Sequence, residues 1–436
     1  MVNKTKKYIV LALILVAVAG GGLASLMHSN GQVLGESVVT NSGSIWEYEC
    51  LDTMKFSRDT ARDWVGNPGG LQKVIDSQIA AIKDLGANCV AIDTPYDEEF
   101  IPFMTKWVNE AREQNLKVWF RGNFSGWEGW FGYKKFTSAQ EHIDKTKYFL
   151  TNHSNLFVEG DIFTPAPEAE NGVLKDPGRN PVAAEEFRNF VIQSTAACNE
   201  SFAKVSKKGI RCGYYSANGD VARLVFTPDS VAKTGGVIVA DHYVKTAERF
   251  INDLIYLHEL QKAPVVVGEF GAPIHDIHGA MTEQQQADFI AQEIELLYKH
   301  REIFTGINYW VAHGGETAVF RKDGSAKPVA QVLKNYFKPG IVSGVVVDKY
   351  GRFLSGVKVG INNGASVLTD SRGYFQIPVP ANSNRILSVS GNDFNPVEIS
   401  VRLGNGDTTS YQVTLNKIHP SLIYQVRSEI LKFFGL

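Results

Sequence analysis

The chain has 436 residues, more than the roughly 250–300 that one hydrophobic core usually serves, so we expect at least two domains. Hydrophobic residues make up 44% of the sequence and charged residues 21%, which excludes a disordered, collagen-like or multi-span membrane chain. The 44 Lys and Arg nearly balance the 46 Asp and Glu, and the net charge is -2. Such a chain has no overall attraction to phosphate backbones, so we expect no nucleic-acid partner.

The first residues have the pattern of an export signal. Lys4, Lys6 and Lys7 precede an uncharged apolar run over residues 8–27, about long enough to cross a bilayer. The end of this run, residues 20–25, offers small residues but no clean A-x-A site, so both a cleaved signal peptide and an uncleaved membrane anchor within residues 1–28 stay open. Residues 29–44 are rich in Asn, Ser and Gly, which predicts a linker. We expect an extracellular or cell-surface protein, membrane-anchored if the segment is uncleaved.

Residues 45–339 alternate short apolar runs with helical stretches. The eight runs lie at residues 45–48, 89–92, 117–120, 156–158, 210–214, 237–240, 264–267 and 305–310. Short apolar strands separated by helices are typical of parallel sheets covered on both faces, and eight such units predict an α/β fold of the (β/α)8 TIM-barrel type. An open doubly wound sheet is the alternative. It is disfavoured because the sequence has neither an early G-x-G-x-x-G turn nor a phosphate-binding G-x-x-x-x-G-K loop.

Polar and aromatic residues follow seven of these strands, at the end where a TIM barrel places its active site. Each residue type also occurs in ordinary turns or cores, but their repetition at successive strand ends predicts a binding or catalytic mouth. Aromatic faces there would stack on sugar rings. The residues predicted to bind substrate are Asp93, Arg121, Asn123, Trp127, Trp130, Tyr215, His242, Tyr243, Asn308 and Trp310.

Three glutamates are the candidate catalytic residues. Glu269 directly follows the seventh apolar run, and Glu168 and Glu170 lie in a loop after the fourth run that two prolines stiffen. Glycosidic hydrolysis needs two facing carboxylates, one to protonate the leaving oxygen and one to meet the oxocarbenium-like carbon. We therefore predict Glu269 as nucleophile and Glu168 as acid/base, with Glu170 as the alternative acid.

The sequence GEFG at residues 268–271 resembles the nucleophile motif of family 5 cellulase-type glycoside hydrolases. Their clan shares a (β/α)8 barrel with catalytic glutamates after strands four and seven. The sequence DHY at residues 241–243 resembles the clan's His and Tyr at strand six, and Trp310 resembles its substrate platform. The usual Asn-Glu-Pro motif is replaced by PEA at residues 167–169, so the acid/base stays open between two glutamates. The resemblance implies a retaining, metal-independent hydrolase of a poly- or oligosaccharide without a cofactor.

Two other readings of the same residues remain. His275 and His278, with His242 and Glu269, could ligate zinc in a barrel metallohydrolase. The expected polar, irregular loop and the lack of an early H-x-H pair favour a solvated histidine loop, so we expect no metal. The second is a barrel that binds a cell-surface glycan without cleaving it. The missing Asn-Glu-Pro motif favours this binder, and the three glutamates oppose it.

The pattern changes after residue 339. Short strands recur about every ten residues up to residue 416, which predicts a small antiparallel β-sandwich. The sequences SGVVVD at 343–348 and TDSRGYF at 369–375 resemble the carboxypeptidase regulatory-like domain, which implies a spacer or adhesion role without a catalytic group. Apolar residues at helical spacing over 417–436 predict an amphipathic helix that packs on the sandwich.

The four cysteines, at positions 50, 89, 198 and 212, are scattered and form no C-x-x-C pair. This spacing matches neither a zinc site nor a disulfide framework, so we interpret them as buried free thiols.

Overall fold

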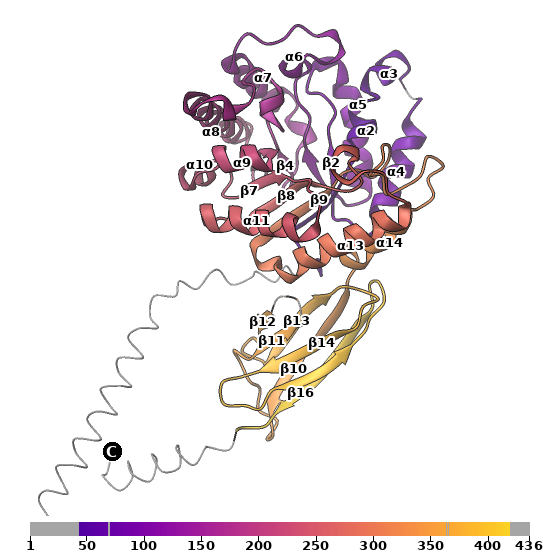
Figure 1. Ribbon diagram of the computed structural model, residues 1–436, viewed down its shortest axis with the longest axis vertical. Coiled ribbons are helices and arrows are strands. Elements are labelled where there is room, and N and C mark those ends of the chain that lie inside the picture. The colour runs from indigo at the N-terminus through magenta and orange to yellow at the C-terminus, as the bar shows by residue number, and fades with distance from the viewer. Residues whose placement is uncertain (1–42, 69, 363, 365, 419–436) are drawn as a thin grey trace, which may run out of the picture. The chain divides into compact units, whose positions relative to one another are not determined.

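The computed structural model describes residues 43–68, 70–362, 364 and 366–418 (Figure 1). The predicted export segment and nearly all of the predicted C-terminal helix lie outside these residues. Within the described part of the chain, no helix combines the length and the apolar character that crossing a membrane requires.

The first domain contains one parallel sheet that closes on itself. Its strands are β1 (Tyr48–Asp52), β2 (Cys89–Ile92), β3 (Lys117–Phe120), β4 (Ile162–Phe163), β5 (Arg211–Cys212), β6 (Ser216–Asn218), β7 (Ile238–Asp241), β8 (Val265–Phe270) and β9 (Phe304–Tyr309). They are ordered β5-β4-β3-β2-β1-β9-β8-β7-β6. The two ends of this order, β5 and β6, are consecutive pieces of the single segment 211–218. Eight strand positions therefore form a ring, which confirms the (β/α)8 barrel.

The fifth strand of the ring is interrupted between β5 and β6. Gly213 and Tyr214 both have positive φ, at 99° and 50°. A Cβ atom at Gly213 would lie 2.5 Å from the carbonyl oxygen of Thr234, so only glycine fits there. The kink sends the chain from its pairing with β4 to its pairing with β7.

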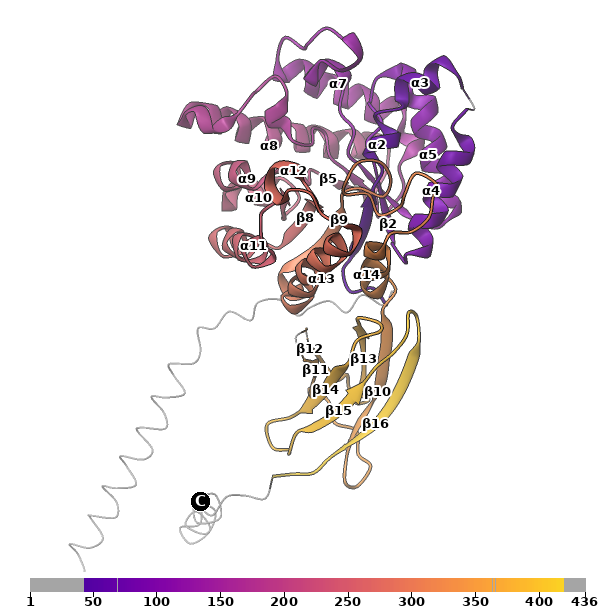
Figure 2. The ribbon, with the colours of Figure 1, turned by 45° about the vertical axis from the view of Figure 1, so that its right-hand side comes forward.

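Helices surround the sheet (Figures 1 and 2). They are α2 (Met54–Ser57), α3 (Ala61–Gly66), α4 (Gln72–Asp84), α5 (Ile101–Glu113), α6 (Ser125–Glu128), α7 (Ala139–Asn152), α8 (Pro181–Lys204), α9 (Gly219–Val225), α10 (Pro228–Lys233), α11 (Ala247–Gln261), α12 (His275–His278), α13 (Glu283–Lys299) and α14 (Pro328–Phe337). Side-chain caps begin several of them: Ser138 accepts from the Glu141 amide, and Thr246 from that of Arg249. The main apolar core lies between these helices and the outside of the barrel.

A second, smaller apolar cluster fills the inside of the barrel. Along β1, Tyr48 and Cys50 belong to this inner cluster, whereas Leu51 belongs to the outer core, as the alternation of a strand requires. The buried Trp119 ring of β3 is its largest member. The barrel is therefore packed below its mouth, and polar side chains gather at the carboxyl ends of the strands.

The cysteines form two disulfides, so the prediction of free thiols was wrong. One bridge joins Cys50 of β1 to Cys89 of β2, and the other joins Cys198 of α8 to Cys212 of β5. Cys50 and Cys89 are direct partners in the β1–β2 register, with Cα atoms 4.4 Å apart. Because they lie 39 residues apart in the sequence, their proximity cannot be read from the sequence alone.

Two predicted strand positions were also wrong. The first strand is β1, which begins at Tyr48 and runs to Asp52, four residues beyond the predicted run. The fourth strand is β4. The apolar run at residues 156–158, predicted as this strand, instead begins at the last residue of a short 3-10 helix (Ser154–Leu156). Phe157 in that run packs on the rings of Phe120 and Phe202, so its apolar character serves the core between sheet and helices.

The second domain is the predicted β-sandwich. Its strands are β10 (Gly340–Asp348), β11 (Lys358–Ile361), β12 (Ser366–Leu368), β13 (Tyr374–Val379), β14 (Arg385–Ser390), β15 (Val397–Val401) and β16 (Thr408–Leu415). They form one sheet ordered β13-β10-β16 and another ordered β12-β11-β14-β15, with a separate apolar core. The strands β10 and β16 run parallel, and the remaining pairs are antiparallel, as predicted.

Candidate active site

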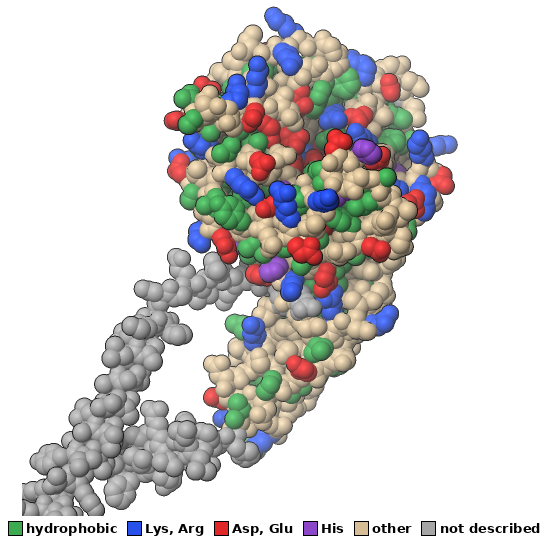
Figure 3. Space-filling model, viewed as in Figure 1, with side chains coloured by type: hydrophobic (Ala, Val, Ile, Leu, Met, Phe, Trp, Pro, Cys, Tyr) green, Lys and Arg blue, Asp and Glu red, His purple; other side chains and the backbone are tan. Residues whose placement is uncertain are grey.

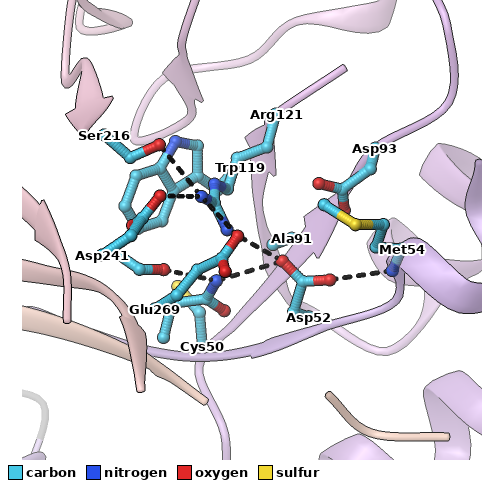
Figure 4. A network of polar contacts seen from close by, with 12 residues as sticks. Cys50, Asp52, Met54, Ala91, Asp93, Trp119, Arg121, Ser216, Asp241 and Glu269 are labelled. Carbon is cyan, nitrogen blue, oxygen red and sulfur yellow. Dashed lines mark hydrogen bonds and ion pairs between the residues drawn. The ribbon is translucent and has the colours of Figure 1, made fainter. Parts of the chain in front are cut away.

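Figure 3 shows a hollow in the surface of the first domain, which acidic side chains flank. At the carboxyl ends of the strands, charged residues from different strands meet in one network (Figure 4). This is where the sequence predicted the catalytic mouth.

Arg121, at the end of β3, is the centre of the network. Its side chain is 1% exposed, and its guanidinium lies 2.9 Å from Asp52 Oδ2, 3.2 Å from Asp241 Oδ2 and 3.0 Å from Glu269 Oε1. It also donates to Ser216 Oγ at 3.0 Å. Figure 4 shows these groups converging from β1, β6, β7 and β8 on one side chain. Arg121 therefore ties five strand positions together at the mouth.

The network holds more carboxylates than it has positive charge. Burial raises the pKa of Asp241 well above its ordinary value, and the charge of Glu269 raises it further while Arg121 opposes both. Asp93, at the end of β2, is 1% exposed, and neither carboxylate oxygen has a hydrogen-bond partner among the described residues. Burial and the charge of Asp52 raise the pKa of Asp93 well above its ordinary range. Burial and the neighbouring carboxylates thus favour the protonated forms of Asp93 and Asp241.

Glu269, in β8, is fixed through both carboxylate oxygens. Oε1 faces Arg121, and Oε2 accepts a hydrogen bond of 2.9 Å from the Tyr243 hydroxyl. Burial raises the pKa of Glu269 to about 7, the guanidinium of Arg121 opposes this, and the charge of Glu168 adds to it. A Cβ at the preceding Gly268 would lie 2.3 Å from Asp241 Oδ1, so glycine is required for the close approach of β7 and β8.

Glu168 lies in the loop after β4, in a left-handed conformation with φ of 42°. Its amide donates to the Ser216 carbonyl oxygen at 3.0 Å, which anchors the loop to strand five. Its Oε2 accepts from the Asn171 side chain at 3.0 Å. Burial and the charge of Glu170 raise the pKa of Glu168. The Ser216 hydroxyl accepts from Arg121, which faces Glu269, so the backbone of Glu168 is joined to Glu269 through Ser216 and Arg121.

Glu170 is held differently. Its Oε1 accepts from the Asn218 amide at 3.1 Å, and its Oε2 is buried without a hydrogen-bond partner in the described structure. Burial raises the pKa of Glu170. The charge that adds to this rise is that of Asp176, not that of Glu269. Of the two loop glutamates, Glu168 is the one whose charge adds to the raised pKa of Glu269.

A third glutamate, Glu128 of α6, adjoins this pair and was missed by the sequence analysis. Its Oε1 accepts from Asn123 Nδ2 at 3.0 Å. Burial raises the pKa of Glu128 to about 7, and the charges of Glu168 and Glu170 add to the rise. The sequence analysis considered residues close to strand ends, whereas Glu128 follows the end of β3 by eight residues. The short helix α6 places it beside the loop glutamates.

Aromatic rings with cations over them line the rim. Trp130 is half-buried, and the Arg58 guanidinium lies 4.9 Å from its ring centroid. Lys55 Nζ lies 5.5 Å from the half-buried ring of Trp310. The Tyr243 ring meets Trp310 edge-on, with centroids 6.3 Å apart. A planar ligand that stacks on these tryptophans must displace the cations or bind beside them.

Several predicted substrate-binding residues lie behind the mouth. Trp127 is fully buried and stacks on Phe190, with centroids 4.9 Å apart and planes at 11°. The Tyr215 hydroxyl bonds Ser194 of α8. His242 Nε2 lies 3.1 Å from Asp253 Oδ2 of α11.

The two predicted asparagines support other side chains. Asn123 Oδ1 lies 3.0 Å from His142 Nε2, which adds to its bond with Glu128. Asn308 Nδ2 donates to Asp52 Oδ2 at 3.2 Å and to the Gly268 carbonyl oxygen at 2.9 Å. Both amides are 0% exposed, so they orient the residues that face the mouth.

The histidine pair considered for a metal lies in the one-turn helix α12. His278 Nδ1 accepts from the Ile274 amide at 2.9 Å, and Nε2 lies 2.9 Å from the Val244 carbonyl oxygen. Both ring nitrogens are thus engaged with the backbone. Among the described residues, no three His, Cys, Asp or Glu side chains are arranged to hold a metal ion.

Comparison with known proteins gives one family match. Residues 341–416 match the carboxypeptidase regulatory-like domain, which confirms the prediction for the sandwich. A search of curated protein sequences gave no match for the chain.

Among solved structures, the chain is similar to a GH5-4 broad-specificity endoglucanase from Clostridium longisporum, at 16% identity and a TM-score of 0.46, over 71% of this chain and 94% of that one. It is also similar to a family 30 subfamily 8 xylanase from Clostridium acetobutylicum, at 12% identity and a TM-score of 0.45, over 75% of this chain and 77% of that one. A third similar structure is a Bacteroides uniformis β-glucuronidase, at 12% identity and a TM-score of 0.45, over 78% of this chain and 44% of that one. At these identities and TM-scores, the barrel assignment rests on the strand order and not on these likenesses.

Proposed function

We propose that the chain is an exported glycoside hydrolase that cleaves a poly- or oligosaccharide by a retaining mechanism. Glu269 is the nucleophile and Glu168 the acid/base. One observation carries the proposal: Arg121 and Tyr243 hold the Glu269 carboxylate, and the amide of Glu168 bonds Ser216, whose hydroxyl accepts from the same Arg121.

In the first step, Glu269 Oε attacks the anomeric carbon while Glu168 gives its proton to the leaving oxygen. Arg121 and Tyr243 favour the ionised form of Glu269 that this attack needs. The covalent glycosyl–Glu269 ester removes the negative charge that faces Glu168, so the pKa of Glu168 falls. Glu168 then accepts a proton from water, which hydrolyses the ester. This cycle requires the two carboxyl groups to stand roughly 5–5.5 Å apart.

The N-terminal sequence and the two disulfides support export. A positively charged start before an apolar run is typical of translocated chains, and disulfides persist mainly outside the reducing cytosol. The proposed location is extracellular or cell-surface, anchored through residues 8–27 if that segment is retained.

The matched variants Glu168→Gln and Glu170→Gln test the proposal, because both remove one carboxylate from the same loop. Glu168→Gln should slow substrates with poor leaving groups by roughly 10²–10⁴-fold and aryl glycosides with good leaving groups much less. Added azide should restore its turnover by attacking the glycosyl ester. If Glu170→Gln shows this behaviour instead, the acid/base is Glu170. If neither variant changes turnover while oligosaccharide still binds, the chain is the non-catalytic glycan binder.

A further inference from the structure

The outer face of the sheet β13-β10-β16 in the sandwich carries side chains that the proposed catalysis does not use. Val346, Phe375 and Val413 point into the sandwich core, so alternate residues of the same strands point outward. The register places outward Val345 beside Tyr374 of β13 and Gln412 of β16. These side chains share one face.

Two aromatic rings stand side by side on this face. Tyr374 pairs with Val345, and Phe353 pairs with Val347 in an antiparallel bridge. Paired residues of antiparallel strands point to the same side, and Val345 and Val347 are two residues apart. Tyr374 and Phe353 therefore lie on one face, with their Cα atoms about 7 Å apart along β10. Tyr374 is 40% exposed and Phe353 59%. The Tyr374 hydroxyl donates to Gln376 Oε1 at 2.9 Å, which limits the motion of its ring.

No outward position of β10, β13 or β16 carries a charged side chain. The other side chains around the rings are amides and hydroxyls, such as Gln376, Gln412 and Thr414. The charged residues that flank the two rings in the sequence are paired: Asp348 with Arg352 at 2.7 Å, and Asp370 with Arg372 at 3.7 Å. A face without charge neither attracts nor repels an ion, so it is suited to a neutral ligand.

We propose that this face is a second carbohydrate-binding site, which takes an uncharged polysaccharide chain across Phe353 and Tyr374. The rings supply flat apolar platforms for sugar rings, and the amides and hydroxyls supply hydrogen-bond partners for sugar hydroxyls. A second copy of the chain is a poorer occupant, because the core of a homodimer interface is more apolar than this mixture. Binding at this site would hold the protein on the polysaccharide that the barrel cleaves. This role is separate from the catalytic activity proposed above.

Binding of the full chain to insoluble, uncharged polysaccharides tests this site. Amorphous cellulose, xylan and mannan serve as probes, in a Glu269→Gln background that prevents turnover. The wild-type face should bind at least one probe, and Phe353→Ala/Tyr374→Ala should weaken this binding at least tenfold. Leu368→Ala/Ile386→Ala is the matched control, since it removes two exposed apolar side chains from the other sheet. Binding should also persist in 1 M salt, because no charge is involved.

The outcomes separate this site from the proposed catalysis. Turnover of a soluble aryl glycoside, with Glu269 intact, should be unchanged by Phe353→Ala/Tyr374→Ala. Failure of all three probes to bind, or equal loss in the control pair, would overturn the proposal. Self-association that the aromatic variants abolish would instead identify a second copy as the occupant. If turnover is absent in every form while the aromatic pair still governs binding, the second site stands and the hydrolase proposal falls.

Discussion

The hydroxyl of Tyr243 should set the pH at which Glu269 becomes an active nucleophile. It donates a hydrogen bond of 2.9 Å to Oε2, while Arg121 faces the other oxygen. Tyr243→Phe removes this donor without changing the ring and leaves a buried carboxylate oxygen without its partner. A hydrogen bond to a charged group contributes about 1.5–3 kcal/mol. Since each pKa unit corresponds to about 1.36 kcal/mol, the pKa of Glu269 should rise by about 1–2 units.

The direction in which the pH profile moves follows from the fact that the ionised form of Glu269 is the nucleophile. Burial already raises the pKa of Glu269 to about 7, so a further rise moves the acidic limb of the pH profile to higher pH. At pH 6, kcat/KM should fall by about 10–100-fold, and part of the loss should return as the pH rises. The assay is kcat/KM against pH for an aryl glycoside with a good leaving group, which depends little on the acid.

Tyr309→Phe is the control, because it removes a buried hydroxyl that donates to the Thr317 carbonyl oxygen at 2.8 Å and touches no catalytic carboxylate. It should cost stability without moving the acidic limb. An unmoved limb in Tyr243→Phe, or the same displacement in both variants, would refute the assignment of Glu269 as a nucleophile stabilised by Tyr243.

Three further outcomes are expected. Burial raises the pKa of Glu49 from 4.5 to about 8, so its proton stabilises the folded state at low pH, and this stability is lost as the pH rises from about 4.5 to about 8. Urea unfolding should show a loss on the order of 4–5 kcal/mol over this range that Glu49→Gln abolishes. Replacing Cys50 and Cys89 with alanine should lower the free energy of unfolding by up to about 4 kcal/mol, since the bridge closes a loop of 39 residues; an unchanged thermal midpoint would contradict this. Activity should survive EDTA because both His278 ring nitrogens have backbone partners, and zinc-dependent recovery would argue otherwise.

The sequence predicted the barrel because its parallel strands are short, apolar and covered on both faces. The predicted strands at residues 89–92 and 117–120 coincide with β2 and β3. Placing the strand ends also placed Arg121 and Glu269 at the mouth. Asp52 was missed because the first strand was placed four residues too early, so its carboxyl end fell at Tyr48.

The remaining differences arise from side-chain direction and from tertiary proximity. Trp127 and Tyr215 follow strands as predicted, but both side chains point toward α8. There Trp127 stacks on Phe190, and the Tyr215 hydroxyl bonds Ser194. Position after a strand does not decide which way a ring points. The pairing of Cys198 with Cys212 depends on the docking of α8 against β5, which periodicity alone does not give.

The arrangement of carboxylates around Arg121 has a consequence for calorimetry. One guanidinium serves several buried acids, and the pKa values of Asp93, Asp241 and Glu269 are raised. A ligand that covers the mouth removes the remaining water from Glu269 and so favours uptake of a proton from the buffer. The observed heat of binding will therefore contain the buffer's heat of ionisation. Titrations in phosphate and in Tris at one pH should differ in enthalpy while giving the same affinity, and the difference counts the protons that enter with the ligand.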